Sequence, residues 1–218
     1  MDRVTSRAGT GPPAGRRRKP TAERRAEIVA AACEIALAEG LDSLTLRRVA
    51  DTLGVVPGLV SHYFPAADGL VAQAFADVMT YDRDQTFARI GAAGPACLGQ
   101  LRELLRYMVS DERDRISLLW LDAWHGARHR PALRAALVTQ MQAWDSALAG
   151  LVAAGAEAGE FRAADPLLAA RRILATIDGL TVVAAIKSAI DISMVGDLVI
   201  ATAERELGLP QGQLKSAP

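Results

Sequence analysis

The segment from Thr45 to Phe64 constrains the fold of this chain more than any other, because it combines a short amphipathic helix, a glycine turn and a second helix. Apolar residues at helical spacing give the first helix one buried face, namely Leu46, Val49, Ala50 and Leu53. Gly54 is placed to end that helix, because glycine adopts the left-handed conformation of a helix C-terminus at little cost. Pro57 is placed to begin the next helix, where its missing N–H is not needed. The segment therefore predicts a helix-turn-helix unit, whose second helix can enter the major groove of DNA.

Helical periodicity on both sides of this segment predicts an all-α fold. The first helix is expected to begin with Thr21 as its N-cap and to end at Gly40, and Thr45 is expected to cap the second helix. A fourth helix is expected after the turn at 65–68, and strand-like alternation is missing from the rest of the chain. Later helices are predicted at 83–91, 95–109, 112–126, 131–157, 166–189 and 194–207.

The chain divides into four expected segments. Residues 21–66 would form a three-helix helix-turn-helix domain, and residues 67–208 a C-terminal helical bundle for regulation and dimerisation. Residues 1–20 would be a disordered basic arm, and residues 209–218 a flexible tail. The basic run Arg16–Lys19 has two interpretations: a solubilising tail, or an arm that follows the DNA backbone or enters a neighbouring minor groove.

Basic and acidic residues are equal in number over the whole chain but are unevenly distributed along the sequence. Lys and Arg together number 25, as do Asp and Glu, whereas a protein that coats nucleic acid indiscriminately is usually more basic. The basic excess within residues 1–25 instead fits local contact with phosphates.

No apolar signal segment or run of membrane-spanning length is present, so we expect a cytoplasmic protein with no membrane partner. Cys33 and Cys97 are expected to be small buried hydrophobic residues rather than a disulfide.

The segment from Arg24 to Phe75 resembles the DNA-binding domain of the tetracycline-repressor (TetR) family of bacterial transcriptional regulators. The residues that carry this resemblance are Ala31 to Gly40, Thr45-Leu46, Val49-Ala50, Leu53-Gly54-Val55, Gly58, Tyr63-Phe64 and Leu70. The residues that look like the BetI subgroup are Ser61 to Phe64, Gly69-Leu70, Trp120, Trp124, Pro131 to Arg134, Trp144, Gly159 to Phe161, Asp165-Pro166 and Ile177 to Leu180. Ala67 departs from the family, which usually has a phosphate-contacting lysine at this place.

The resemblance implies a homodimer that binds a palindromic operator in double-stranded DNA and is released by an unidentified small-molecule effector. Three alternatives stay open: a transcriptional activator, a ligand-independent regulator of the same fold, and a helical interaction scaffold that does not bind DNA. The last is kept because of Ala67. An enzyme is not expected, because the chain has no Ser-His-Asp arrangement, phosphate-cradling glycine loop or paired-cysteine metal motif. No cofactor and no metal are expected.

The candidate DNA-contacting residues lie on and just before the second helix of the helix-turn-helix unit. They are Arg47, Arg48, Val56, Pro57, Gly58, Leu59, Ser61, His62 and Tyr63. Apolar side chains among them can touch thymine methyl groups, and the histidine and tyrosine can contact phosphates. The two arginines can reach the backbone or a base edge, or can belong to a solvated helix face. Val60 and Phe64 are expected to point into the protein.

The candidate effector-binding residues are large side chains on helices that would face one another in the bundle. They are Tyr107, Met108, Trp120, Leu121, Trp124, Met141, Trp144 and Ile177, which could equally be plain core. The expected dimer interface uses apolar positions of the last two helices, namely Ile173, Ile177, Leu180, Val183, Val195, Leu198 and Thr202. Asp122, His125 and His129 share the spacing of metal ligands, but exposed histidines at a helix C-terminus are the favoured interpretation.

Overall fold

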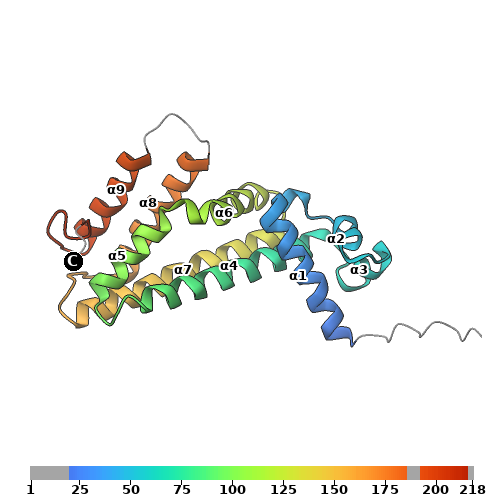
Figure 1. Ribbon diagram of the computed structural model, residues 1–218, viewed down its shortest axis with the longest axis horizontal. Coiled ribbons are helices and arrows are strands. Elements are labelled where there is room, and N and C mark those ends of the chain that lie inside the picture. Colours follow the sequence, from blue (N-terminus) through green and yellow to red (C-terminus); the bar gives the residue numbers. More distant parts are fainter. Residues whose placement is uncertain (1–19, 186–191, 216–218) are drawn as a thin grey trace, which may run out of the picture.

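The computed structural model describes residues 20–185 and 192–215, and every regular element in these ranges is a helix, which confirms the all-α fold class (Figure 1). The N-terminal elements are α1 (Thr21–Glu39), the 3-10 turn η1 (Leu41–Ser43), α2 (Leu46–Leu53) and α3 (Pro57–Tyr63). The remaining elements are α4 (Ala67–Gly91), α5 (Cys97–Met108), the 3-10 turn η2 (Asp111–Arg113), α6 (Asp114–Gly126), α7 (Pro131–Glu157), α8 (Pro166–Ala185) and α9 (Ile192–Glu206).

The helix-turn-helix unit forms through the local backbone chemistry that its sequence predicts. The side chain of Thr45 accepts a hydrogen bond from the Arg48 N–H at 3.0 Å, so Thr45 is the N-cap of α2. Gly54 ends α2 in the left-handed conformation, with φ 62°, and Pro57 is the first residue of α3. These three predictions are confirmed. The prediction that Thr21 caps α1 is wrong, because α1 already includes Thr21 and follows Pro20, and no side chain caps its N-terminus.

The helix α4 is longer than the sequence suggested. It runs without interruption through 25 residues, so the separate helix predicted at 83–91 is wrong. The polar residues Asp82 and Thr86, which resemble a surface segment in the sequence, are buried inside the bundle. The helix α4 therefore extends from the N-terminal elements into the C-terminal part, where it lies alongside α7 (Figure 1).

The other helix boundaries agree with the predictions to within a few residues. The helix α7 spans the predicted range 131–157, and α8 begins at Pro166 as expected. The predicted helix at 112–126 begins as the turn η2 and continues as α6. Positions 186–189, which were included in the helix predicted at 166–189, lie outside the described residues.

Two hydrophobic cores hold the chain together. The first contains the inner faces of α1, α2 and α3 and the facing ends of α4, α6 and α7, with Ile28, Val49 and Phe75 fully buried. The second lies among α5, α7, α8 and α9. The side chain of Trp120, on α6, packs against both cores. A change in the position of α6 therefore has to affect the packing of both parts of the molecule.

The chain after α9 is packed rather than free as far as Lys215, which differs from the flexible tail expected at 209–218. Leu214 is buried in the second core. The buried carboxylate of Glu204 accepts hydrogen bonds from the backbone N–H groups of Gly212 and Leu214, both at 2.9 Å. This one acidic side chain therefore fixes the C-terminal turn.

Cys97 is buried and Cys33 is partly buried, and both are free thiols. Burial raises the pKa of the Cys33 thiol to about 11, so this group stays protonated near neutral pH. No helix within the described ranges is both long and apolar enough to cross a membrane.

Candidate functional site

The short helix α3 divides into an inner and an outer face. Val60 is 0% exposed and Phe64, just after the helix, is also buried, so both point inward as predicted. Val56, by contrast, is 72% exposed. The predicted DNA-contacting residues that lie fully on the outer surface are Val56, Pro57, Gly58, Ser61 and His62, and those that are partly buried are Leu59 and Tyr63. The exposed face of α3 is thus small and mostly apolar, with few groups for base-specific hydrogen bonds.

The polar groups of α3 are partly used within the helix. The Ser61 hydroxyl donates to the backbone carbonyl of Pro57 at 3.2 Å. The rings of His62 and Tyr63 meet edge to face, with centroids 5.3 Å apart. These contacts leave the His62 ring on the surface, where it can reach a phosphate.

The two neighbouring arginines of α2 differ in how they are held. The guanidinium of Arg48 forms an ion pair with Glu39 and donates to the Thr52 hydroxyl at 2.6 Å. The pair with Arg48 lowers the pKa of the Glu39 carboxyl, chiefly through the hydrogen bond that Arg48 donates. Arg47 is exposed on the same short helix, and no ion pair or side-chain hydrogen bond of Arg47 is found with the described residues. Arg47 is therefore the more available cation of the pair for contact with DNA.

The C-terminal part contains a cavity of about 50 Å³ between α5, η2, α6, α7 and α8. Five of the predicted effector-binding residues line it, namely Met108, Trp120, Met141, Trp144 and Ile177. The other three, Tyr107, Leu121 and Trp124, do not. Trp124 instead packs against Trp120, with ring centroids 5.8 Å apart, and against the first core. The ring of Tyr107 lies under the guanidinium groups of Arg89 and Arg113.

The cavity also has lining residues that sequence reasoning missed. They are Arg113, Ser117, Asp145, Leu174, Asp178 and Thr181. Three of these six carry charges, and charged residues in a helix are ordinarily attributed to its solvated face. Asp178 gave one signal, because an acidic residue followed by a glycine in the middle of an apolar helix is unfavourable for helix formation.

The charges at the cavity are unevenly compensated. Asp145 forms an ion pair with Arg171, with Nε and Oδ2 2.8 Å apart, and Arg113 forms one with Asp82. Asp178 has no ion pair with any residue that the structure describes. Burial raises the pKa of the Asp178 carboxyl to about 6, and the negative charge of Asp145 adds to this effect. The cavity therefore holds one carboxylate whose negative charge is not balanced by a neighbouring cation.

A second unsatisfied group lies in the cavity wall. The indole Nε1–H of Trp144 is buried, and no acceptor for it is found in the described parts of the chain. A buried donor without a partner costs free energy, so a ligand oxygen that accepted this hydrogen bond would be favoured. The residues that line the cavity thus include one carboxylate without a cation partner, two indole rings and one indole N–H without an acceptor.

The three residues with metal-ligand spacing do not come together. His125 and His129 are exposed at the end of α6 and just beyond it. The Asp122 carboxylate instead accepts the backbone N–H of Leu41 at 2.9 Å, which attaches α6 to the turn η1. Gly40 has a φ of 85°, which favours glycine, and a Cβ atom added there would lie 2.8 Å from the same carboxylate. Asp122 therefore connects the cavity-lining helix α6 to the helix-turn-helix part.

The residues predicted for a dimer interface fall into three groups. Ile173, Ile177, Leu180 and Thr202 are buried by other helices of the same chain, so they have little surface left for a second chain to cover. Leu198 is 54% exposed. The side chains of Val183 and Val195 lie outside those that the structure describes. Val182, which was not predicted, is 43% exposed on α8.

Comparison with known families matches both parts of the chain. Residues 28–74 match the family described as bacterial regulatory proteins, tetR family. Residues 99–207 match the family described as BetI-type transcriptional repressor, C-terminal.

Among individual proteins, the chain is similar to the HTH-type transcriptional regulator BetI 1 of Chromohalobacter salexigens. The two are 32% identical over 117 residues, which is 51% of this chain and 56% of that protein. This chain is also 31% identical over 113 residues to BetI of Burkholderia mallei, and the match covers 51% of this chain and 58% of that protein. The chain thus spans somewhat more than half the length of the curated relatives it matches.

Solved structures share the fold over a longer range. A TetR-family transcriptional regulator from Rhodococcus sp. has a TM-score of 0.69 and 26% identity, covering 86% of this chain and all of its own. A transcriptional regulator from Saccharomonospora viridis in complex with choline has a TM-score of 0.69 and 20% identity, covering 86% of this chain and 98% of its own.

Proposed function

The chain belongs to the TetR family of bacterial transcriptional regulators, with a C-terminal part of the BetI type, and from this premise we propose that it is a ligand-responsive repressor. It would bind a palindromic operator as a homodimer and leave the DNA when a small molecule fills the cavity. The mechanism is a shift of population, in which the effector binds the DNA-incompetent arrangement more tightly than the competent one.

The observation that supports DNA binding is the combination of an exposed α3 with Arg47 beside it. The proposed contact residues are Arg47, Arg48, Val56, Pro57, Gly58, Leu59, Ser61, His62 and Tyr63. The mostly apolar outer face of α3 can follow the groove closely but makes few specific hydrogen bonds. Sequence preference would therefore depend strongly on the shape of the operator and on the arginines.

The observation that supports a particular class of effector is the unbalanced charge of Asp178 beside aromatic rings. A cation in the cavity would face this carboxylate and the indoles of Trp120 and Trp144, and indole is the strongest of the aromatic partners for a cation. The positive charge of Arg113 is already offset by Asp82, so it opposes such a ligand only weakly. The effector would therefore be an organic cation, with an oxygen atom placed to accept the Trp144 N–H.

The size of the cavity limits the effector further. A volume of about 50 Å³ has room for a few water molecules, which suits a small ligand. Choline, the ligand of the regulator from Saccharomonospora viridis, is a small cation with one hydroxyl group. It is therefore the first molecule to test.

The proposed dimer would use α8 and α9. The exposed apolar side chains of Val182 and Leu198 are available there. A Cβ atom added at Gly179, in the middle of α8, would meet nothing within 4 Å in this chain. A glycine in a helix interior costs stability, and close approach of a second copy of α8 would explain its presence.

The proposal is tested with a fluorescent duplex that carries the DNA directly upstream of the protein's own gene. Fluorescence anisotropy is expected to show saturable binding at low salt, lost on addition of choline. Asp178→Asn should bind the duplex as the wild type does and fail to respond to choline. If the protein bound the upstream duplex no more tightly than scrambled DNA, that result would contradict operator binding. A wild-type response to anionic but not cationic small molecules would contradict the effector class.

A further inference from the structure

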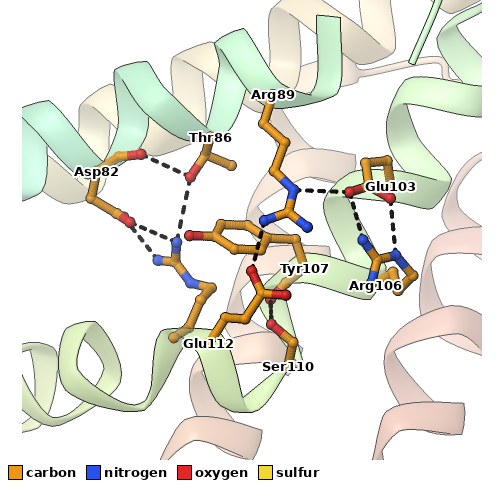
Figure 2. A network of polar contacts seen from close by, with 9 residues as sticks. Asp82, Thr86, Arg89, Glu103, Arg106, Tyr107, Ser110 and Glu112 are labelled. Carbon is orange, nitrogen blue, oxygen red and sulfur yellow. Dashed lines mark hydrogen bonds and ion pairs between the residues drawn. The ribbon is translucent and has the colours of Figure 1, made fainter. Parts of the chain in front are cut away.

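Two ion pairs of opposite polarity join α4 to the single turn η2, which connects α5 to α6 (Figure 2). In one pair, α4 contributes the carboxylate of Asp82 and η2 the guanidinium of Arg113. Their two hydrogen bonds measure 2.8 and 2.9 Å. In the other, α4 contributes Arg89 and η2 contributes Glu112, with Nη1 and Oε2 2.7 Å apart.

The two pairs differ in their surroundings. The side chains of Arg113 and Asp82 are only 4% and 6% exposed, whereas those of Arg89 and Glu112 are 37% and 57% exposed. A buried pair has lost its hydration, so its energy depends strongly on close two-point geometry. An exposed pair is screened and tolerates small displacements.

The buried pair is held from several sides. The Arg113 Nη1 also donates to the Thr86 hydroxyl at 3.4 Å, and that hydroxyl donates to the Asp82 backbone carbonyl at 2.8 Å. The Arg113 guanidinium lies 5.2 Å from the ring centroid of Tyr107 and 5.6 Å from that of Trp144. Figure 2 shows the Tyr107 ring between the buried contacts of Asp82 and the exposed contacts of Arg89.

Arg113 is also part of the cavity wall, together with Trp144 and Asp178, whereas Arg89 and Glu112 are not. The same side chain thus touches the cavity and the helix α4. The helix α4 continues to the first core, where Leu70 and Phe75 pack with the helix-turn-helix elements. A displacement of Arg113 can therefore reach α4 directly, chiefly through the two short hydrogen bonds to Asp82 and also through the longer contact with Thr86.

We propose that Arg113 is the positioning residue that couples the cavity to the helix-turn-helix part, through its buried pair with Asp82. The inference rests on the proposed function, because it requires a cationic effector in this cavity. A cation bound at Asp178 alters the position of the Trp144 ring, against which the Arg113 guanidinium packs at 5.6 Å, so the turn η2 moves. The buried pair then displaces α4, while the Arg89–Glu112 pair only adjusts in solvent.

The test uses a double variant that removes both buried charges and keeps the volume, Asp82→Leu with Arg113→Met. This change avoids leaving one charge buried without a partner. The matched control is Arg89→Met with Glu112→Leu, which removes the exposed pair between the same two elements. For each protein, three quantities are measured: choline affinity by tryptophan fluorescence, operator affinity without choline, and operator affinity in saturating choline.

In the wild type and the control, choline is expected to weaken operator binding by about tenfold or more, within the usual range of coupling between sites. In the buried-pair variant, choline affinity is itself expected to change, because Arg113 lines the cavity, so the comparison is made at saturating choline; there the effect of choline on operator affinity should fall below about twofold. An unchanged choline effect in this variant would overturn the inference. An equal loss of the choline effect in the control variant would also overturn the inference, because the loss would then not be specific to the buried pair.

A second variant, Arg113→Lys, covers the case in which the double variant does not fold. Lysine keeps the charge but cannot make the two-point contact with Asp82, so the choline effect should be reduced and not abolished. A full choline effect in Arg113→Lys, with normal binding of both ligands, would contradict the proposal. If choline has no effect on the wild type, the proposed effector class fails, and the inference fails with it.

Discussion

At the residue scale, the chemistry of the regulatory cavity depends mainly on Asp178. Its carboxylate is removed from water and lies near Asp145, and no described cation offsets its charge. Such a group reduces the stability of the empty protein and favours a cationic ligand. An uncompensated buried charge that serves to bind a ligand thus lowers the stability of the ligand-free protein.

The raised pKa of Asp178 gives the effector a predictable pH dependence. The carboxyl in the empty cavity has a pKa of about 6, and only its ionised form attracts a cation. Choline affinity should therefore be constant above about pH 7 and decrease progressively below about pH 6. Isothermal titration calorimetry across this range checks the prediction, with Asp178→Asn expected to bind weakly at every pH. An affinity independent of pH in the wild type would exclude Asp178 as the contact.

The same shift predicts a pH-dependent change in thermal stability. The pKa of Asp178 is raised from 3.8 to about 6 in the folded protein, so protonation stabilises the fold. This stabilisation is complete below the unfolded pKa and is lost as pH rises through about 6. Asp178→Asn should therefore raise the melting temperature by a few degrees at about pH 8, and by less at about pH 5. Calorimetry that found the larger gain at the lower pH would reverse the sign and refute the assignment.

At the scale of single elements, the helix-turn-helix unit and α6 have different tasks. The unit α2–α3 presents a surface with few polar groups, so the arginines of α2 should contribute much of the affinity. The helix α6 supplies Trp120 to the cavity wall, and its Asp122 holds the turn η1. One helix therefore contacts both the effector cavity and the N-terminal part.

The free and the paired arginine of α2 should differ in their effect on operator binding. Arg47→Ala should lower the affinity and reduce the slope of log K against log salt by about one, as loss of a phosphate contact does. Arg48→Ala should have a smaller effect, because Arg48 must first exchange its pair with Glu39 for a phosphate. Anisotropy titrations at several salt concentrations measure both. Arg115→Ala, an exposed arginine of α6, is the control, and an effect of similar size there would contradict a local contact.

At the scale of the whole molecule, two hydrophobic cores meet at Trp120, and α4 extends alongside α7 (Figure 1). A long rigid helix turns a small displacement near the cavity into a larger displacement at the helix-turn-helix end. In a homodimer, this displacement would change the spacing of the two recognition helices, which must match two operator half-sites. In the proposed mechanism, release of DNA by an effector would therefore require the dimer as well as the cavity.

The proposed dimer interface is tested by placing a charge in it. Leu198 is exposed in the single chain, so Leu198→Glu should leave the folded subunit intact and oppose association. Light scattering with size-exclusion chromatography should show a dimer for the wild type and a monomer for this variant, and operator affinity should fall at least tenfold. Val138→Glu, at an exposed apolar position of α7, should remain dimeric. A dimeric Leu198→Glu would place the interface elsewhere.

The sequence by itself determined the features that depend on neighbouring residues. Thr45, Gly54 and Pro57 act on the backbone within one helical turn, so they specified the helix-turn-helix unit without reference to distant parts. The periodicity of Val60 and Phe64 likewise indicated their inward direction. Thr45, Gly54 and Phe64 are also among the residues that carry the resemblance to the TetR family, which the family matches confirm.

The tertiary structure alone decided which polar residues are buried and what they contact. Asp82 and Thr86 break the apolar pattern of α4, and only the distant Arg113 explains why the helix continues through them. The cavity likewise combines residues from five elements, and the raised pKa of Asp178 depends on burial by helices far apart in the chain. A charged side chain has no fixed preference for surface or interior, because its burial depends on the partner that the fold brings to it.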